Sequence, residues 1–139
     1  MRLPSWLRLV LCFLIIGSSS PVHCGKSEIA RPEALGLVMK WLADTGYETK
    51  SPKFQLATDP DQADFPDFYF FSANYAVDHS APTLGHFAVN RRTADLWDWE
   101  VCKRLQSPLI KAAQESLRRK IGLSRKDYQT LSKIAPCTE

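Results

Sequence analysis

Three side chains near the middle of the sequence have the types that proton-transfer chemistry uses. His86 lies in a predicted strand at 84–90, and Asp98 and Glu100 lie in the next one, at 96–101. A histidine beside a carboxylate can act as a general base, because the negative neighbour raises the pKa of the imidazole. These residues form a candidate catalytic group if the two strands pair in the right register.

The apolar residues of the two strands select that register. Pairing Arg91 with Asp95 places His86 opposite Glu100, with Asp98 beside them on the polar face. The other face then carries only apolar groups: Gly85, Phe87 and Val89 opposite Val101, Trp99 and Trp97. A slip by one residue would invert every side chain and mix the two faces. We therefore predict the register that pairs Arg91 with Asp95.

A catalytic role would also need a nucleophile, and the sequence offers only Ser72 and Tyr75 on the preceding strand. The alternative is an ordinary cross-strand charged pair, worth a few tenths to about 1 kcal/mol. No nucleotide-binding loop or catalytic signature accompanies these residues, so we expect a protein that is not an enzyme.

Other residues could bind ligands, but ordinary structural roles account for them better. Four aspartates at 59, 61, 64 and 67 lack the spacing and the turn glycine of a calcium loop, so we expect a solvated loop. Trp41, Trp97 and Trp99 could stack on a sugar, yet their spacing is typical of core positions. We expect neither a metal nor a cofactor.

The turn between the two strands carries Arg91 and Arg92. A strand pair presents such a turn rigidly, and arginine is enriched at the centres of protein interfaces. We take these two residues as the candidate binding residues.

Residues 1–24 are typical of a secretory signal segment. Arg2 and Arg8 precede an apolar run at 9–16, and small residues and Pro21 follow it. The run is too short for a membrane span, which needs roughly 20 apolar residues. We expect cleavage near Cys24 and an exported protein, periplasmic or extracellular; an acylated Cys24, as in a lipoprotein, is the alternative.

The remaining part, residues 25–139, has the length of one small domain. The signal segment takes two of the 18 basic residues, so the rest nearly balance the 15 acidic ones. Basic residues concentrate after position 90, which is either a solvated face or a surface for an acidic partner or a membrane. We expect no nucleic acid, because the basic runs lack interleaved aromatic residues.

Cys102 and Cys137 both lie beyond the predicted signal segment. Two cysteines in an oxidising compartment favour one disulfide, and there is no C-x-x-C pair or flanking histidine to favour a metal or redox site. We predict a Cys102–Cys137 disulfide.

Hydrophobic periodicity gives the remaining elements. A helix is predicted from Pro32 to Thr45, with an apolar stripe formed by Leu35, Val38, Trp41 and Leu42. Strands are predicted at 54–57, 68–77, 84–90 and 96–101, and helices after Ser107 and Ser124. The order predicts an α+β domain with an N-terminal helix on a sheet of three or four antiparallel strands, then two C-terminal helices tied back by the disulfide.

The segment 87–97 (FAVNRRTADLW) resembles the terminal hairpin of PepSY-type domains, in which a basic turn and Thr-Gly lead into an apolar strand. Ala94 stands where that pattern has glycine. The pattern is shared with cystatin-like and similar small secreted domains, and the chain is otherwise similar to small exported bacterial proteins. These families are largely non-enzymatic and several restrain peptidases or other exported proteins, so the resemblance implies a protein without catalytic activity.

Three hypotheses follow from these observations. The first is an exported, non-catalytic binding or inhibitory protein whose partner is another exported or envelope protein. The second is a small envelope hydrolase that uses His86 and Glu100. The third is an envelope adaptor anchored by lipid through Cys24.

Overall fold

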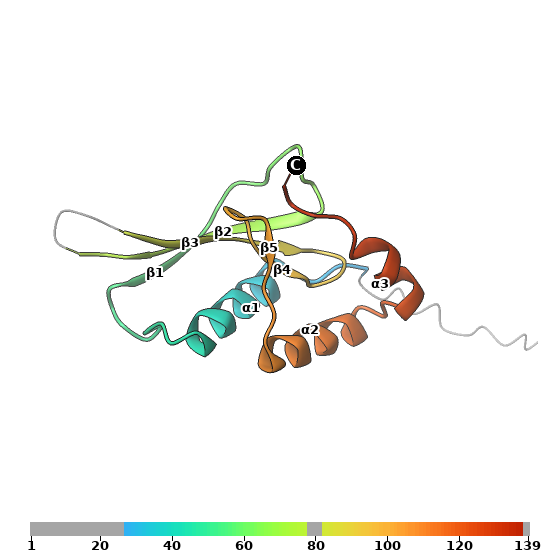
Figure 1. Cartoon of the computed structure of the whole chain (residues 1–139), viewed down its shortest axis with the longest axis horizontal. Helices are drawn as coiled ribbons and strands as arrows, with labels where there is room; N and C mark the ends of the chain where they lie inside the picture. The colour runs from blue at the N-terminus through green and yellow to red at the C-terminus, as the bar shows by residue number, and fades with distance from the viewer. Residues whose placement is uncertain (1–26, 78–81, 138–139) are drawn as a thin grey trace, which may run out of the picture.

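The computed structural model describes residues 27–77 and 82–137, so the predicted signal segment and Cys24 lie outside the described residues. The described part contains a five-stranded antiparallel sheet, in the order β1-β2-β3-β4-β5, and three helices (Figure 1). The elements in chain order are α1 (Arg31–Asp44), β1 (Phe54–Thr58), β2 (Phe68–Tyr75), β3 (Thr83–Asn90), β4 (Leu96–Asp98), β5 (Lys103–Arg104), α2 (Pro108–Lys120) and α3 (Arg125–Leu131).

The α+β class and the three helices follow the prediction, but two details of it are wrong. The sheet has five strands instead of three or four, because the chain turns after Asp98 and returns as the short strand β5. The first helix lies inside the sequence, starting at Arg31, and not at its N-terminal end. No helix in the described ranges has the length and apolar character that a membrane span requires.

Local signals set the helix ends as the sequence indicates. The side chains of Ser107 and Ser124 accept hydrogen bonds from the backbone N–H groups of Ile110 and Asp127, which caps the N-termini of α2 and α3. Helix α2 stops before Gly122, whose φ of 72° is in the left-handed region that favours glycine.

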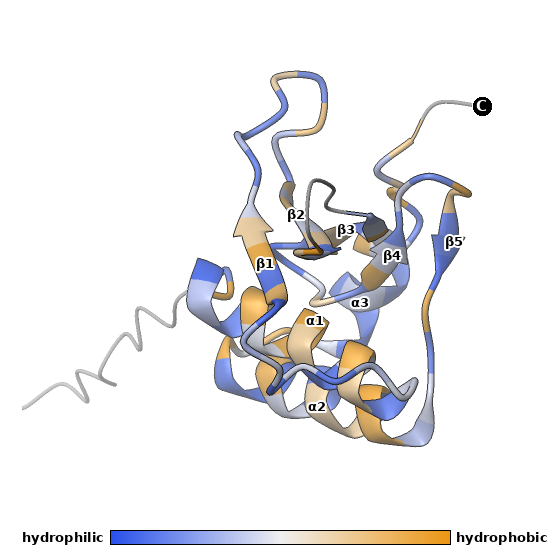
Figure 2. Cartoon of the chain, turned by 90° about the vertical axis from the view of Figure 1, so that its left-hand side faces the viewer, coloured by the Kyte–Doolittle hydropathy of each residue, from blue (hydrophilic) through white to orange (hydrophobic). Residues whose placement is uncertain are grey.

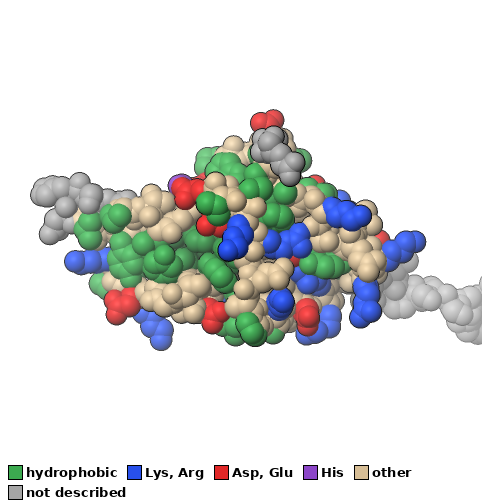
Figure 3. All heavy atoms as spheres, in the orientation of Figure 1, with side chains coloured by type: hydrophobic (Ala, Val, Ile, Leu, Met, Phe, Trp, Pro, Cys, Tyr) green, Lys and Arg blue, Asp and Glu red, His purple; other side chains and the backbone are tan. Residues whose placement is uncertain are grey.

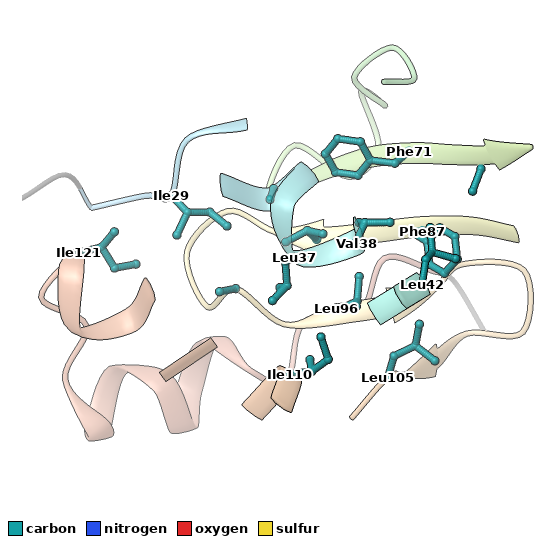
Figure 4. Close-up of a cluster of buried hydrophobic side chains, with 14 residues drawn as sticks. Ile29, Leu37, Val38, Leu42, Phe71, Phe87, Leu96, Leu105, Ile110 and Ile121 are labelled. Atoms are coloured by element: carbon teal, nitrogen blue, oxygen red, sulfur yellow. The ribbon is translucent and has the colours of Figure 1, made fainter. Parts of the chain in front are cut away.

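One face of the sheet packs against α1 and α2, which lie together on the same side of the strands in both views (Figures 1 and 2). Leu37, Val38 and Leu42 of α1 lie against the sheet residues Phe71, Phe87 and Leu96, as Figure 4 shows. Residues from β2, β3, β4, α1 and α2 thus share one core.

The opposite face of the sheet carries a second, aromatic cluster. Phe68, Phe70, Ala88 and Trp97 are buried there, and Phe65, Trp99 and Ala135 pack against them. The chain after α3 therefore crosses to this side, where the indole Nε1 of Trp99 donates a hydrogen bond to the carbonyl of Pro136 (3.0 Å). The predicted Cys102–Cys137 disulfide is present and fixes this crossing.

The β3–β4 register is not the predicted one. Phe87 lies opposite Asp98, Ala88 opposite Trp97 and Val89 opposite Leu96, a slip of one residue. The prediction assumed one apolar and one polar face, whereas both faces of this sheet are buried, so apolar residues belong on both. The alternation of side chains then no longer selects a register.

Candidate binding surface at the β3–β4 hairpin

The turn between β3 and β4, residues 91–95, is closed by its own backbone hydrogen bonds. The N–H of Asn90 donates to the carbonyl of Asp95, and the N–H of Ala94 donates to the carbonyl of Asn90 (both 2.9 Å). The side-chain Oδ1 of Asn90 accepts from the N–H groups of Arg92 and Thr93. Ala94 takes the left-handed conformation (φ 57°) that glycine usually supplies. The loop is therefore rigid although it lacks glycine.

Arg91 is held by internal contacts. Its guanidinium donates to the carbonyl of Phe68, pairs with the carboxylate of Asp61 (3.0 Å) and stacks on the ring of Tyr69 (4.3 Å to the centroid). Only 20% of the side chain is exposed. Of the two candidate binding residues at this turn, Arg91 is therefore largely covered by its own chain.

A second arginine completes the same cluster. Arg31 also pairs with Asp61 (2.8 Å) and also stacks on Tyr69 (4.6 Å). Its hydrogen bond holds the pKa of the Asp61 carboxyl below its ordinary value of 3.8. Desolvation opposes this effect, and the charge of Arg91 adds to it. The predicted acidic loop is thus fastened to the hairpin by at least one of its aspartates.

Arg92 points to a different neighbourhood and makes no side-chain ion pair within the described residues. It lines a groove of about 320 Å³ between the hairpin loop, the α2–α3 turn and α3. The other lining residues are Ser27, Ile121, Gly122, Leu123, Asp127, Thr130 and Leu131. Of the two candidate binding residues, Arg92 is the one available to a partner.

A buried ionic network lies behind the loop. Asp95, 2% exposed, pairs with Arg118 (2.8 Å) and lies 3.7 Å from Arg104, and the hydroxyl of Tyr128 donates to the same carboxylate. The Nε of Arg118 also donates to the carbonyl of Thr93 (2.7 Å). Burial first, and then the charge of Asp95, raises the pKa of Tyr128 above its ordinary 10.0. This network fixes α2 and α3 against the hairpin.

Local sequence patterns do not reveal this network. Asp95 lies 23 residues from Arg118 and 33 from Tyr128, so no local spacing links them. The only local signal is that Asp95 directly precedes the apolar strand residues Leu96 and Trp97. An aspartate at such a position is buried with the strand, and a buried charge needs a partner from elsewhere in the chain.

His86 and Glu100 do lie close together. The Nε2 of His86 is 3.7 Å from the Oε1 of Glu100, and both side chains are solvent-accessible, 36% and 57% exposed. Asp98 does not join them as an acid–base group. Its Oδ1 accepts from the backbone N–H groups of Glu100 and Val101 and so closes the turn that leads to Cys102.

The candidate nucleophiles have other partners. Ser72 lies directly opposite His86 in the β2–β3 ladder, but its hydroxyl donates to the carboxylate of Asp59 (2.9 Å). The hydroxyl of Tyr75 donates to the carbonyl of Glu48 (2.9 Å). A nucleophile hydrogen-bonded to the histidine, as acyl-transfer chemistry requires, is not found among the described residues.

The tryptophans and acidic side chains bear on the remaining ligand hypotheses. Trp97 is buried on the aromatic face with Trp99 beside it, whereas Trp41 packs in the core on the other face, so the three form no shared platform. The described ranges contain no group of three or more His, Cys, Asp or Glu side chains placed to bind a metal ion.

Comparison with known proteins bears on the fold. No family model and no curated protein matches the sequence. A chain of a solved structure, described as a type VI secretion system effector-immunity complex from Pseudomonas protegens, is similar with a TM-score of 0.66 and 24% identity. The match covers 81% of this chain and 93% of that one. The two chains therefore share a fold.

Proposed function

We propose that the protein is an exported, non-catalytic protein that binds another protein and inhibits it. The observation that carries the proposal is the similarity of 81% of this chain to a chain of an effector-immunity complex. In that kind of pair, one protein recognises and restrains the other through a surface. The rigid hairpin loop and the groove beside Arg92 supply a surface that could serve this purpose.

The disulfide and the predicted signal segment support export. Disulfides form and persist in oxidising compartments, and Cys102 and Cys137 are joined. We place the protein in the periplasm or outside the cell, with a mature N-terminus at Gly25 and no lipid on Cys24. Mass spectrometry of the exported protein checks this, because an acylated cysteine adds the mass of its lipid chains.

The contacts around His86 favour binding over hydrolysis. The imidazole and the Glu100 carboxylate are partly exposed, and the opposite serine hydroxyl is engaged with Asp59. A general base gains its effect when it lies within hydrogen-bond reach of the proton that it removes. We assign His86 and Glu100 to an ordinary surface pair.

The test uses the oxidised protein, expressed from the full sequence and purified from the exported fraction. It is used as bait in envelope and secreted extracts, and each captured protein is assayed for its own activity with and without the bait. We expect one partner whose activity falls as the bait approaches an equimolar ratio. No captured protein losing activity would contradict the proposal.

Two variants locate the surface and separate the hypotheses. Arg92→Glu should weaken inhibition, while Lys111→Glu, an exposed charge reversal outside the groove, should not. His86→Ala should leave inhibition intact. A loss of inhibition with His86→Ala in a folded protein would instead support chemistry at the His86–Glu100 pair.

A further inference from the structure

Cations without acidic partners lie on the hairpin loop and on the two helices that adjoin the groove beside Arg92. Arg118 pairs with Asp95, and Lys120 pairs with Glu33. By contrast, Arg92, Arg119, Arg125 and Lys126 have no ion pair within the described ranges. Lys and Arg side chains gather over α3 and the adjoining end of α2, as Figure 3 shows.

Their positions relative to the groove follow from the helix geometry. Thr130 of α3 lines the groove, and Lys126 lies one turn before it, so the two side chains share a helix face. Arg119 lies two residues before the groove residue Ile121 and therefore points from a different face of α2. Arg92 thus lines the hollow, Lys126 lies on the α3 face that borders it, and Arg119 and Arg125 lie on the same two helices outside its lining.

Helix stability does not account for all of these charges. Cations in the last turn of α2 interact favourably with the negative end of its helix dipole. Arg125 and Lys126, however, occupy the first turn of α3, where the dipole is positive and cations are unfavourable. Intramolecular stabilisation therefore explains the charges of α2 better than those of α3.

The groove itself is part apolar. Ile121, Leu123 and Leu131 line it beside Arg92, and its volume of about 320 Å³ is at the lower end of the range for ligand pockets. The acidic lining residue Asp127 has its carboxylate engaged by the hydroxyl of Ser124 (2.6 Å). A hollow of this size and character suits a carboxylate side chain with an apolar neighbour.

We propose that this basic groove is the docking site for an acidic loop of the inhibited protein, with a carboxylate of that loop on Arg92. The proposal rests on the proposed function and specifies the chemistry of its partner. A concave, partly apolar surface favours a protein loop over a flat anionic membrane, which makes the membrane an outcome of the test.

The first experiment uses a defined probe and does not require the natural partner. A fluorescent peptide rich in Asp, Glu and Leu is titrated with the oxidised protein, beside a matched peptide with Asn and Gln. We expect saturable binding of the acidic peptide only, with amide NMR shifts confined to the loop around Arg92, the α2–α3 turn and α3. Shifts elsewhere, or equal binding of both peptides, would overturn the proposal.

Charge variants make the test specific. Arg92→Glu with Lys126→Glu should weaken peptide binding by about tenfold or more, because two attractions become repulsions. Lys53→Glu with Lys111→Glu makes the same change of net charge outside the groove and should alter it by less than about twofold. Asp127→Asn should strengthen binding. Equal losses in both pairs would mean that only net charge matters.

Two further outcomes separate this proposal from the proposed function. Binding to anionic phosphatidylglycerol vesicles, without binding to the acidic peptide, would overturn the groove proposal in favour of a membrane. An inhibited partner that the Arg92→Glu/Lys126→Glu variant captures as well as the unmodified protein does would support the inhibitory function and reject this groove as its site. Peptide binding at the groove without any inhibited partner would support the groove as a binding site for acidic chains and reject the inhibitory function.

Discussion

At the scale of residues, the buried Asp95 contributes more contacts between elements than the pair His86 and Glu100. One carboxylate, almost without solvent exposure, accepts from Arg118 and Tyr128 and lies near Arg104. Desolvated charges are costly unless they are paired and hydrogen-bonded. The network therefore joins the hairpin to α2 and α3 only while all its members are present.

Removing the charge of Asp95 tests this role. Asp95→Asn keeps the shape but leaves Arg118 without its carboxylate, so the free energy of unfolding should fall by about 2–4 kcal/mol. Urea denaturation measures the change. Glu115→Gln, an exposed substitution on α2, should change stability by less than about 0.5 kcal/mol. A loss below about 1 kcal/mol for Asp95→Asn would mean that the network is not coupled.

Ala94 offers a second test, because its backbone is left-handed (φ 57°) and its side chain is fully buried. Ala94→Gly removes a conformational cost of about 1 kcal/mol and also a buried methyl worth about 0.8 kcal/mol, so little net change is expected. Ala94→Val adds a branched side chain to a filled, left-handed site and should destabilise by about 2 kcal/mol or more. Thermal unfolding of the pair measures both, and equal stability of the two variants would contradict the argument.

At the scale of elements, the sequence predicted best where local chemistry decides. The caps at Ser107 and Ser124 are local signals, and the two C-terminal helices begin where they predict. Strand β5 has only two residues, so no periodicity could reveal it. The β3–β4 register was wrong because the choice rested on one-sided burial, and Ala88 and Trp97 are buried on the second face.

The same contrast applies to the candidate site. His86 and Glu100 lie close together even though the predicted register was wrong, because the turn after Asp98 returns Glu100 toward β3. Arg92 lies at a groove that the α2–α3 turn completes, which depends on packing between segments distant in sequence. Local patterns could identify the loop but not its surroundings.

The acidic loop that follows β1 should respond to acid through Asp61. The folded state holds the pKa of Asp61 below 3.8, so its ion pairs with Arg31 and Arg91 stabilise the fold above that pH. This contribution is lost as the pH falls below 3.8 toward the lowered pKa. Asp61→Asn should therefore unfold with a weaker dependence on pH in the range below pH 3.8 than the unmodified protein. Urea titrations across that range test it, with exposed Asp64→Asn as the control; identical pH dependence of all three proteins would argue against the linkage.

At the scale of the whole molecule, the two faces of the sheet are covered by different kinds of packing. Helices α1 and α2 cover one face through aliphatic packing, whereas the second face depends on aromatic residues and on a chain segment held by one covalent bond. The aromatic layer therefore depends on the Cys102–Cys137 disulfide more than the helical layer does.

Reducing the disulfide should consequently weaken the fold as a whole. The bond closes a segment with a sequence separation of 35 residues, and the chain-entropy model gives about 3–4 kcal/mol for such a loop. Cys102→Ser with Cys137→Ser should lose about that much in urea denaturation. Hydrogen exchange should show the loss of protection spreading from residues 132–137 to β4. Unchanged stability would mean that the aromatic cluster alone holds this segment.

The hydrogen bond from Trp99 to Pro136 gives the protein a built-in optical reporter. The indole lies 4.9 Å from Phe70 and donates to the residue beside Cys137. Its emission therefore depends on whether the segment after α3 is seated, while the groove at Arg92 lies at another part of the surface. Reduction of the disulfide should thus shift the Trp99 part of the protein's fluorescence, to which Trp41 and Trp97 also contribute, without any added label.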